Sequence, residues 1–574
     1  MAELLVGPLV RAIGPNFVAI WTEWTHPCEV TLWAVPANHT TNQEQDIKSF
    51  RSRTIRVGKR HYAMSRLSAL QAATWYTYHI ASARQDGEQF LPPATSTLVQ
   101  AFRTLDLPEA GKALRLAYGS CRKQTSPQPD TLSAFGSWLL DSMHERETRW
   151  PHLLLLIGDQ IYADDYTGRR KRTQPLSQDD PSQKSYRTGA QTFAEFADLY
   201  EAAWTSDDGI RQVFAVLPVY MIFDDHEVTN SWNISPAWRS FALRRGLEQT
   251  LVDGLVAYWI YQGWGNICTQ SVDSNPLLTI MWKAAQSGED ALEDLRAYMR
   301  RGVYEDAYLQ WYYAIPTMPP IFVADVRADR PANLNGTGTS DAPARIMSRE
   351  QMRELHFWMR EHDSSTALLV SSVPVILTPF IGFAEYLMGI RPLRYFPFSP
   401  LRKLGRHLAA IQQKLALSMS FDHWPVFAET WYEFVKLFAA RRHDIVILSG
   451  DVHFSYSIEA HRTFFRSHKH ASVYQLVASP FNNVLERRDR RLILAQAWIK
   501  RMAYGGLHMR MLPLVRPKGI NSISHDLLLQ NIISLVTFQP KDTKENSGRY
   551  SIQQIYLSVK NGTLQEIAAT SVSR

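Results

Sequence analysis

Residues Leu153 to Asp165 read LLLLIGDQIYADD, and this stretch decides the fold. An unbroken apolar run this short is typical of a central strand that is buried on both faces of a sheet. Gly158 lets the chain turn where that strand ends, so Asp159 and Tyr162 follow at its carboxyl end. Because open α/β sheets bind ligands at the carboxyl ends of their strands, we expect a functional site here.

Three other stretches share this design of an apolar strand followed by polar residues: LRLAYGSC (114–121), VYMIFDDHEVTNSW (219–232) and DIVILSGDVHFS (444–455). In one α/β architecture, the carboxyl ends of these strands aim their polar residues at one place. The side chains brought together would be those of Cys121, Asp159, Tyr162, Asp225, His226, Asp451 and His453.

Length and composition bound the class of protein. At roughly 150 residues per domain, 574 residues predict three or four domains, or fewer if one α/β domain carries insertions. A hydrophobic content of 45% and a charged content of 20% are typical of a globular protein. The net charge of +7 arises largely from local basic runs such as 169–172, which we interpret as solvated loops. The second interpretation of the positive charge is that it attracts an anionic substrate, and no nucleic-acid partner is predicted.

The cysteine content and the first residues bear on the cellular compartment in which the protein is expected. The three cysteines, Cys28, Cys121 and Cys268, are too few for a disulfide framework. The first residues, MAELLVGPLVRAI, lack the pattern of a signal peptide, and no apolar run reaches about 18 residues. We therefore expect a soluble, cytoplasmic protein, and the sequence predicts no oligomeric state.

The pattern of short alternating runs in residues 1–105 predicts a separate all-β domain. Short alternating runs separated by Gly, Pro and Asn are typical of sandwich strands, and they lie at 17–24, 30–35, 75–80 and 96–102. The segment LSALQAATWYTYHI followed by LVQAFRT resembles a fibronectin type III or immunoglobulin-like module. The polar stretch DLPEAGKA at 106–113 is the expected linker.

The remainder, residues 114–574, alternates strands with helices, which predicts an α/β layered domain. Helical apolar spacing occurs at 132–145, 192–204, 349–362 and 429–442. Ser348 and Gln351 predict a capping box at the start of the third of these helices. Insertions interrupt the pattern near 165–190 and 381–424, and we expect the first, which is polar, to be a mobile loop over the site.

The second insertion contains a predicted amphipathic helix. Its apolar residues recur at steps of three and four with basic residues between them: Leu401, Leu404, Leu408, Ile411 and Leu415. We expect this stripe to pack on the protein itself. Contact of residues 381–420 with a membrane surface or a partner is the less favoured interpretation.

The polar residues at the strand ends are of types that bind metal ions. Carboxylate, imidazole, phenolate and thiolate groups bind cations, and two cations bridged by a carboxylate can clamp a phosphoryl group. Without a cation, so many ligands would repel one another. Asp451 and His453 are two residues apart in GDVH, so both face one ion if the chain stays extended, while Val452 packs backwards.

The order of these motifs resembles the PhoD-like (alkaline phosphatase D) metallophosphatases, within the calcineurin-like and purple acid phosphatase superfamily. The match runs from Leu114 to about Ile458 and comprises GSC (119–121), GDQIYAD (158–164), DDHEVTNSW (224–232), D-x-R (325–327), D-x-W (422–424) and SGDVH (449–453). Each motif alone is weak. All of them in this order, each at an expected strand end, form a strong signal.

The resemblance implies a two-sheet β-sandwich core flanked by helices, and hydrolysis of phosphate esters, either monoesters or diesters. It also implies iron(III) with calcium beside it, other divalent ions being alternatives. Cys121 and Tyr162 would bind iron as thiolate and phenolate, and Asp159 would bridge the ions. The full set of metal ligands carried over is Cys121, Asp159, Tyr162, Asp225, Asp451 and His453.

The resemblance also implies residues that act on the substrate. His226 stands in the place of the histidine of the superfamily's G-N-H-E motif, and it would donate a proton to the leaving oxygen after attack by a metal-activated water. Asp225 precedes it in the place of the asparagine. Arg327 and Arg122 are the candidate substrate-binding residues, and Arg327 could instead pair with Asp325.

Asp224, Glu227 and Asp325 are candidates for outer partners that orient the metal ligands, and the first two could also cap the following turn. The chain departs from the wider superfamily, because GSC replaces its opening D-x-H and LLVSSVPV (368–375) lacks the histidine of its V-x-x-H. So few histidines favour oxygen-loving ions over a zinc or dinuclear manganese centre. No chemistry is assigned to His144, His152, His356, His423 and His443.

Two other functions are alternatives. The chain could be a non-catalytic, metal-containing binding protein that acts through its β domain and basic insertion, or Cys121 could be a nucleophile with a histidine base. A zincin protease is excluded, because HEVTN lacks the second histidine of H-E-x-x-H, and G-x-S-x-G and Walker A motifs are absent from the sequence.

Overall fold

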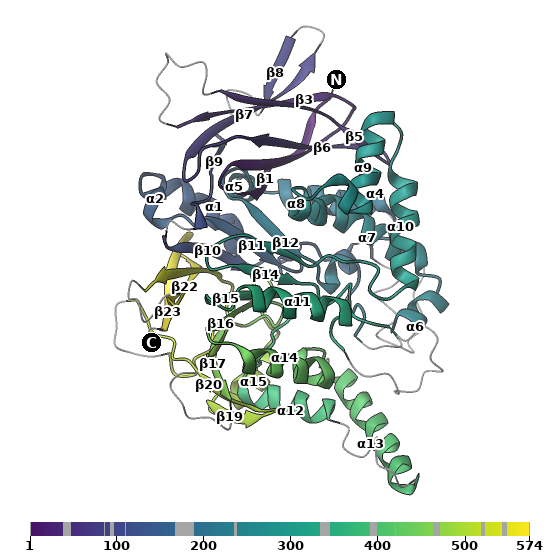
Figure 1. Cartoon of the computed structure of the whole chain (residues 1–574), viewed down its shortest axis with the longest axis vertical. Coiled ribbons are helices and arrows are strands. Elements are labelled where there is room, and N and C mark those ends of the chain that lie inside the picture. Colours follow the sequence, from purple (N-terminus) through teal and green to yellow (C-terminus); the bar gives the residue numbers. More distant parts are fainter. Residues whose placement is uncertain are drawn as a thin grey trace.

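The strands that carry the predicted site residues all form, and they belong to two sheets in the middle of the molecule (Figure 1). The structure, a computed structural model, describes residues 2–37, 47–84, 87–91, 97–108, 111–166, 189–234, 238–332, 345–390, 399–419, 421–462, 471–517, 523–541 and 548–572. The expected mobile loop at 167–187 and the basic run at 169–172 lie outside these ranges.

The first of the two central sheets has the order β12-β11-β10-β21-β22-β23 in the described residues. β10, β11 and β12 are parallel, and the last three strands of the chain extend the sheet in antiparallel fashion. The strands are β10 (Leu114–Gly119), β11 (Leu153–Ile157), β12 (Val219–Ile222), β21 (Ile533–Pro540), β22 (Tyr550–Lys560) and β23 (Thr563–Val572). The apolar run that opens LLLLIGDQIYADD is therefore an interior strand, β11, with every residue buried.

The second central sheet has the order β13-β14-β15-β16-β18-β17-β20-β19 in the described residues. β14, β15, β16 and β18 are parallel, so their carboxyl ends share one edge. The strands are β13 (Tyr313–Ile315), β14 (Ile321–Ala324), β15 (Ala367–Ser371), β16 (Ile445–Ser449), β17 (Tyr456–Arg462), β18 (Val473–Val477), β19 (Arg501–Tyr504) and β20 (Leu507–Met511).

Side-chain alternation along the second sheet explains how the layers stack. Leu368 and Val370 of β15 belong to a hydrophobic core shared with β10 and β11, whereas Ala367 and Leu369 belong to a second core shared with helices. Successive residues of a strand point to opposite faces. The second sheet therefore packs one face on the first sheet and the other on helices, and a mixed α/β fold is confirmed.

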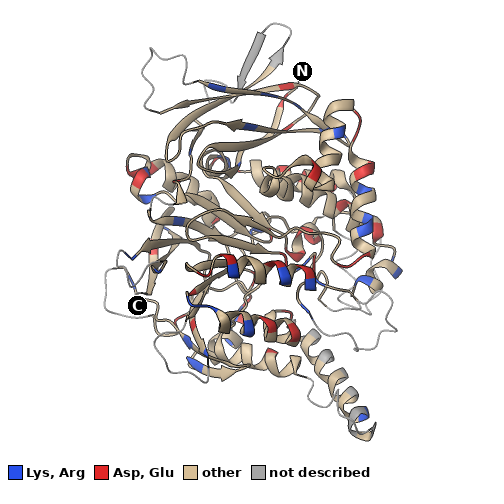
Figure 2. Ribbon diagram, viewed as in Figure 1, with Lys and Arg blue, Asp and Glu red and all other residues tan. Residues whose placement is uncertain are grey.

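The helices predicted in the four stretches of helical apolar spacing form within a few residues of their expected bounds, as α1, α4, α11 and α14. Charged residues are frequent on the helices at the outside of the molecule, such as α10 and α11 (Figure 2). The helices are α1 (Thr131–Asp141), α2 (Arg146–Arg149), α4 (Phe193–Thr205), α5 (Asp208–Val216), α6 (Trp238–Arg244), α7 (Glu248–Tyr258), the π-helix Trp259–Gly263, α8 (Trp264–Ile267), α9 (Pro276–Ser287), α10 (Leu292–Tyr304), α11 (Arg349–Glu361), α12 (Pro379–Gly389), α13 (Ser399–Ser418), α14 (Ala428–Ala440) and α15 (Arg487–Gln496).

The start of α11 differs from the predicted capping box. The Ser348 hydroxyl accepts a hydrogen bond from the backbone N–H of Gln351, as expected. The Gln351 side chain, however, does not return to Ser348. Its carbonyl oxygen accepts from the N–H of Asp325 and its amide donates to the carbonyl oxygen of the same residue. Gln351 therefore holds the loop after β14, at the edge of the site.

The amino-terminal region is all β, as expected, and consists of two sheets in the described residues, β1-β2-β6-β5 and β4-β3-β7-β8, with β9 paired to β7. The strand expected at 96–102 is β9, which begins only at Ala101. The strands are β1 (Leu4–Ile13), β2 (Phe17–Trp24), β3 (Glu29–Pro36), β4 (Lys48–Arg53), β5 (Ile55–Val57), β6 (Arg60–Ser68), β7 (Trp75–Arg84), β8 (Gly87–Leu91) and β9 (Ala101–Arg103).

The amino-terminal sheets share their hydrophobic core with the first central sheet and its helices. Arg11 of β1 is fully buried, and its guanidinium donates to the carbonyl oxygens of Val219, Tyr261 and Gln262 at 2.6–3.1 Å. A buried guanidinium must be satisfied in this way, because an unpaired one is costly. β1 is thereby tied to the strand that leads into the DDHE motif.

The stripe of the second insertion is exposed, which corrects the expectation that it packs on the protein. Leu404, Leu408, Ile411 and Leu415 of α13 are all exposed, and the buried positions of that helix are small residues. The side chain of Leu401 lies outside the described part. No described helix is both long enough and apolar enough to cross a membrane.

His152, at the start of β11, predicts a pH dependence of stability. Its Nδ1 accepts from the N–H of Arg115 at 3.3 Å, and burial, helped by Arg115 and Arg103, lowers its pKa to about 3. An unfolded histidine takes up a proton below about pH 6.5, whereas the folded one does not. Stability due to this group is thus full above pH 6.5 and is lost as the pH falls.

We expect His152→Gln to gain about 1–2 kcal/mol of unfolding free energy relative to the unmodified protein between pH 6.5 and pH 5, measured by urea unfolding. Substitution of the exposed His508 by Gln is the control, and its unfolding free energy should change with pH as that of the unmodified protein does. Parallel pH curves for His152→Gln and the unmodified protein would contradict the prediction.

Candidate metal centre

The carboxyl ends of strands from both central sheets meet at one place. The turns after β10 and β11 carry Cys121 and Asp159, and the turn after β12 carries Asp225. The turn after β16, in the second sheet, carries Asp451 and His453. Residues separated by more than 300 positions are thus adjacent.

Among the described residues, three groups of side chains have ligand atoms within 4.8 Å of one another: Cys121, Asp159 and His453; Asp159, Asp225 and His226; and Asp224, Asp225 and Asp451. Asp159 belongs to the first two groups and Asp225 to the last two. A carboxylate shared between two groups is placed to bridge two ions, which is the arrangement of dinuclear centres.

The backbone at the site is strained. Cys121, Asp159, Asp451 and His453 have φ values of 59°, 55°, 66° and 58°, in the left-handed region that residues with a side chain rarely adopt. Each such residue costs about 1–3 kcal/mol, and strain of this kind gathers at functional sites. The expectation of an extended GDVH segment is therefore wrong. Val452 packs against the second hydrophobic core and also lines the cleft.

The electrostatics of the cluster fit a cation. Burial, followed by the charges of Asp159 and Asp451, raises the pKa of Cys121 well above its usual value. Burial likewise raises the pKa values of Asp159 and Tyr162. The Asp159 Oδ1 atom is buried without a hydrogen-bond partner in the described part of the chain. A cation would supply that partner and favour the charged forms of these ligands.

Burial keeps His453 neutral, and neighbouring side chains hold Tyr162 in place. Burial lowers the pKa of His453 to about 4, which keeps its imidazole neutral, the form that binds metals. The Tyr162 hydroxyl accepts from Asn483 Nδ2 at 2.8 Å and lies 3.4 Å from Asp159 Oδ2. Asn483, in the loop after β18, was not found from the sequence because no motif surrounds it.

His226 lies beside this group, with its ring centroid 4.2 Å from that of Tyr162. Its Nδ1 is 2.7 Å from Asp164 Oδ1, so Nε2 is the nitrogen left for a ligand or substrate. Burial lowers the pKa of His226, but Asp225, Asp159 and Asp164 outweigh it and raise the pKa well above its usual value. Asp164, the last residue of GDQIYAD, orients this ring.

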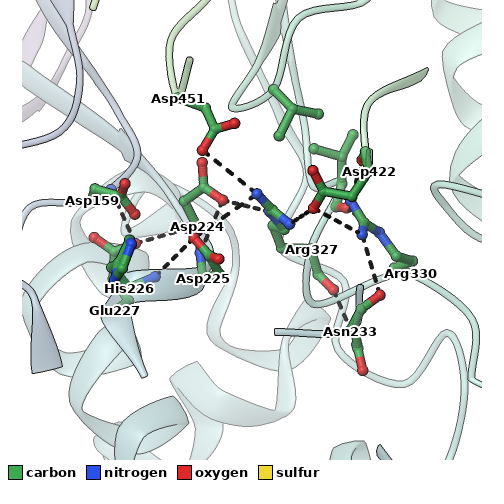
Figure 3. Close-up of polar contacts among 12 residues, drawn as sticks. Asp159, Asp224, Asp225, His226, Glu227, Asn233, Arg327, Arg330, Asp422 and Asp451 are labelled. Atoms are coloured by element: carbon green, nitrogen blue, oxygen red, sulfur yellow. Dashed lines mark hydrogen bonds and ion pairs between the residues drawn. The ribbon is translucent and has the colours of Figure 1, made fainter. Parts of the chain in front are cut away.

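Arg327 forms the opposite side of the cluster (Figure 3). Its guanidinium donates to Asp224 at 2.5 Å and to Asp422, and it lies 3.9 Å from Asp225 and 3.6 Å from Asp451. The side chain is only 2% exposed. Arg327 therefore neutralises and positions carboxylates of the site.

Asp325 does not pair with the guanidinium of Arg327. Its carboxylate accepts from the backbone N–H groups of Arg327 and Ala328 at 3.0 and 2.8 Å, so it shapes the turn that carries Arg327. Arg122 also lies apart from the cluster. Its guanidinium donates to Asp130 at 2.6 Å and to the carbonyl oxygen of Ala203, away from the cleft.

Glu227 links the turns after β11 and β12. Its carboxylate is buried and accepts from the N–H groups of Asp159, Gln160 and Asp224 at 3.2, 2.6 and 2.8 Å. With Asp224 it forms a capping box around the short 3-10 helix Asp225–Glu227. Glu227 is therefore a cap of this turn, as one of the two alternatives predicted. It also fixes the backbone at Asp159, and its role in orienting a metal ligand stays a prediction.

His423 is a site residue that the sequence interpretation missed. Its Nδ1 is 2.7 Å from Glu385 Oε1 of α12, and its Nε2 is 3.3 Å from Asp451 Oδ2. This contact and Arg327 outweigh burial and hold the pKa of Asp451 below its usual range. The available signal was its position next to Asp422 in the D-x-W motif.

The cluster opens into a cleft of about 350 Å³. Its lining includes the polar side chains of Asp159, Asp225, His226, Asp451 and His453. It also includes apolar side chains: Leu377, Ile381, Met419, Phe421, Phe454, Leu485 and Ile493.

The fold and the clustered ligands at its strand ends define the chain as a metallophosphatase, a class of phosphoric ester hydrolase. The model of the PhoD-like phosphatase family matches residues 120–491, and the chain belongs to this family. Residues 1–103 match a domain of unknown function, DUF7800. None of the curated proteins matches the chain significantly.

Two solved structures are similar to this chain, and the first of them, with the higher TM-score, shares its fold. The structure of PhoD has a TM-score of 0.53 at 13% identity, over 97% of this chain and 91% of that one. Purple acid phosphatase PPD1 from yellow lupin (Lupinus luteus) seeds has a TM-score of 0.47 at 8% identity, over 99% of this chain and 74% of that one.

Proposed function

We propose that the protein hydrolyses phosphate monoesters or diesters at a centre formed by Cys121, Asp159, Tyr162, Asp225, Asp451 and His453. The observation that carries this proposal is the shared position of Asp159 in two groups of ligands beside a cleft. We further propose iron(III) and calcium as the ions, since thiolate, phenolate and carboxylate donors outnumber imidazoles. Bound ions would bind the ester oxygens as Lewis acids and activate water.

In this proposal the chain's own residues position the ester and manage protons. His226 donates a proton from Nε2 to the leaving oxygen, while Asp164 at Nδ1 keeps the ring oriented and protonated. Arg327 keeps Asp224, Asp225 and Asp451 in place through its ion pairs. The apolar residues of the cleft lining limit the access of bulk water.

The domain division remains part of the proposal. We propose a fibronectin III-like domain at 1–105, a linker at 106–113 and a phosphatase domain at 114–574. Cys121 as a nucleophile is the weaker alternative, because its thiol is fully buried and its pKa is raised. The other alternative, a non-catalytic binding protein, is weaker because the chain belongs to a family of phosphatases.

The test of the function is a panel of phosphomonoesters and diesters, assayed before and after dialysis against a chelator, together with metal analysis. We expect turnover of at least one class, its loss with the ions, and its return when iron and calcium are restored. Full activity in protein shown to be free of metal would refute the proposal.

The role of His226 predicts a dependence on the leaving group. His226→Gln should lower turnover of alkyl phosphates by about 10²-fold or more, and of p-nitrophenyl phosphate much less, because a stable phenolate leaves without a proton. His461→Gln, on β17 outside the cleft, is the control. An equal loss for both esters would show that His226 is not the proton donor.

A further inference from the structure

The helices α12, α13 and α15 lie at the end of the molecule opposite the amino-terminal sheets (Figure 1). Exposed apolar side chains occur on α12, on or just after α13, and on or just after α15. Ile411, Leu492 and Trp498 are 60%, 62% and 74% exposed. We call the whole set the apolar rim; its residues are Phe380, Leu387, Leu404, Leu408, Ile411, Leu415, Met419, Leu492 and Trp498.

α13 packs on the protein by its small residues. Gly405, Ala409 and Ala416 are buried, and Gln412 Nε2 donates to the carbonyl oxygens of Leu387 and Ile390 at the end of α12. An amphipathic helix normally buries its large apolar side chains. Here those residues face solvent, so the helix presents an apolar face that marks an interaction surface.

Basic side chains flank the apolar rim. Arg487, Arg488, Arg490 and Arg491 of α15 are exposed, and in the described part of the chain no ion pair engages them. Exposed Leu and Trp beside clustered arginines are typical of surfaces that bind anionic lipid. A second copy of the chain would bring the same positive charge to this face, so self-association is opposed by repulsion.

The apolar rim continues into the cleft. Met419 lines the cleft, as does Ile493, the neighbour of Leu492 on α15. Ile381, the neighbour of Phe380 on α12, also lines the cleft. Met419 thus belongs to both the apolar rim and the cleft lining, so the rim adjoins the cavity that Asp159 and His226 also line.

We propose that the apolar rim and the arginines of α15 dock the protein on the surface of an anionic lipid bilayer, with the mouth of the cleft toward the lipid. The apolar side chains enter the interface between headgroups and acyl chains, and the arginines contact anionic headgroups. The docking concerns the surface alone and does not depend on the proposed hydrolysis.

The test is flotation of the full chain with vesicles of phosphatidylcholine alone or mixed with phosphatidylserine. We expect binding to the mixed vesicles that weakens as salt is added. Leu408→Asp combined with Ile411→Asp should reduce the partition coefficient by about ten-fold or more, because two apolar side chains no longer enter the interface. Trp282→Asp, at an exposed aromatic residue on α9 far from the cleft, is the matched control.

A second variant tests the charge. Arg487→Glu combined with Arg491→Glu should abolish the preference for phosphatidylserine while circular dichroism stays unchanged. Neither variant should alter hydrolysis of soluble p-nitrophenyl phosphate, so a failure of docking and a failure of the proposed activity are seen separately. The proposal would be overturned by equal binding to both vesicle types or by undiminished binding of the rim variant. It would also be overturned if the rim substitutions changed only the oligomeric mass of the protein in sedimentation, because the rim would then be a contact between copies of the chain.

Discussion

Asp159→Asn is expected to reduce phosphate-ester hydrolysis by about 10³-fold or more, because in the proposed centre Asp159 would bridge both ions, whose contribution is worth several kcal/mol. The variant should also retain less metal, measured by elemental analysis. Its metal-free form should unfold at a higher temperature than the unmodified metal-free protein. The substitution removes one buried charge from a set of carboxylates that repel one another.

A loss of activity and metal together with a more stable metal-free form distinguishes a metal ligand from a structural carboxylate. Asp329→Asn is the control, since Asp329 is also buried and burial with the charge of Asp325 raises its pKa to about 8. At pH 7 it is already largely protonated, so asparagine mimics it closely. A normal metal content in Asp159→Asn, or a loss of activity as large in Asp329→Asn, would remove Asp159 from the centre.

Arg327→Met is expected to lower the unfolding free energy by about 3–5 kcal/mol, the cost of leaving buried charges without their partner. Asp224 and Asp422 would each lose a direct ion pair inside the protein. Activity should fall as well, since the carboxylates beside the ions would no longer be positioned. Urea unfolding of the metal-free protein measures the first effect without interference from the ions.

Arg239→Met is the matched control for this prediction. Its guanidinium is equally buried, but its carboxylate partner, Asp306, is 39% exposed and can be hydrated once the arginine is lost. We expect a clearly smaller loss of stability there. A loss in Arg327→Met no greater than in Arg239→Met would show that the carboxylate network does not depend on Arg327.

The strands of the site could be predicted from the sequence because their signal is local. β11, β12 and β16 are short, wholly buried and almost entirely apolar, and each is followed within two residues by Gly or Asp; burial on both faces favours that composition. The order of the motifs then identified the family, and the model match confirms it. The side chains at those strand ends do lie together in the described structure.

What the sequence did not indicate are contacts between residues that are distant in the chain. Arg122 stays a predicted substrate-binding residue, but its guanidinium donates to the carbonyl oxygen of Ala203 as well as to nearby Asp130. His423 was set aside because its partners, Glu385 and Asp451, lie on other elements. Periodicity cannot indicate such pairs, since they form only when separate layers pack.

The pattern of apolar and polar residues was sufficient for the strands and the main helices, because these depend on local burial. The order of the motifs identified the family, and the position of Asp159, Asp225 and His453 after strand ends predicted that they converge. Packing of the two sheets against each other decided which carboxylates Arg327 neutralises and which residues adopt strained backbone. It also left the stripe of α13 facing solvent, although its spacing resembles that of a buried helix. Periodicity shows that a helix has an apolar face, but only the neighbouring elements determine whether that face is covered.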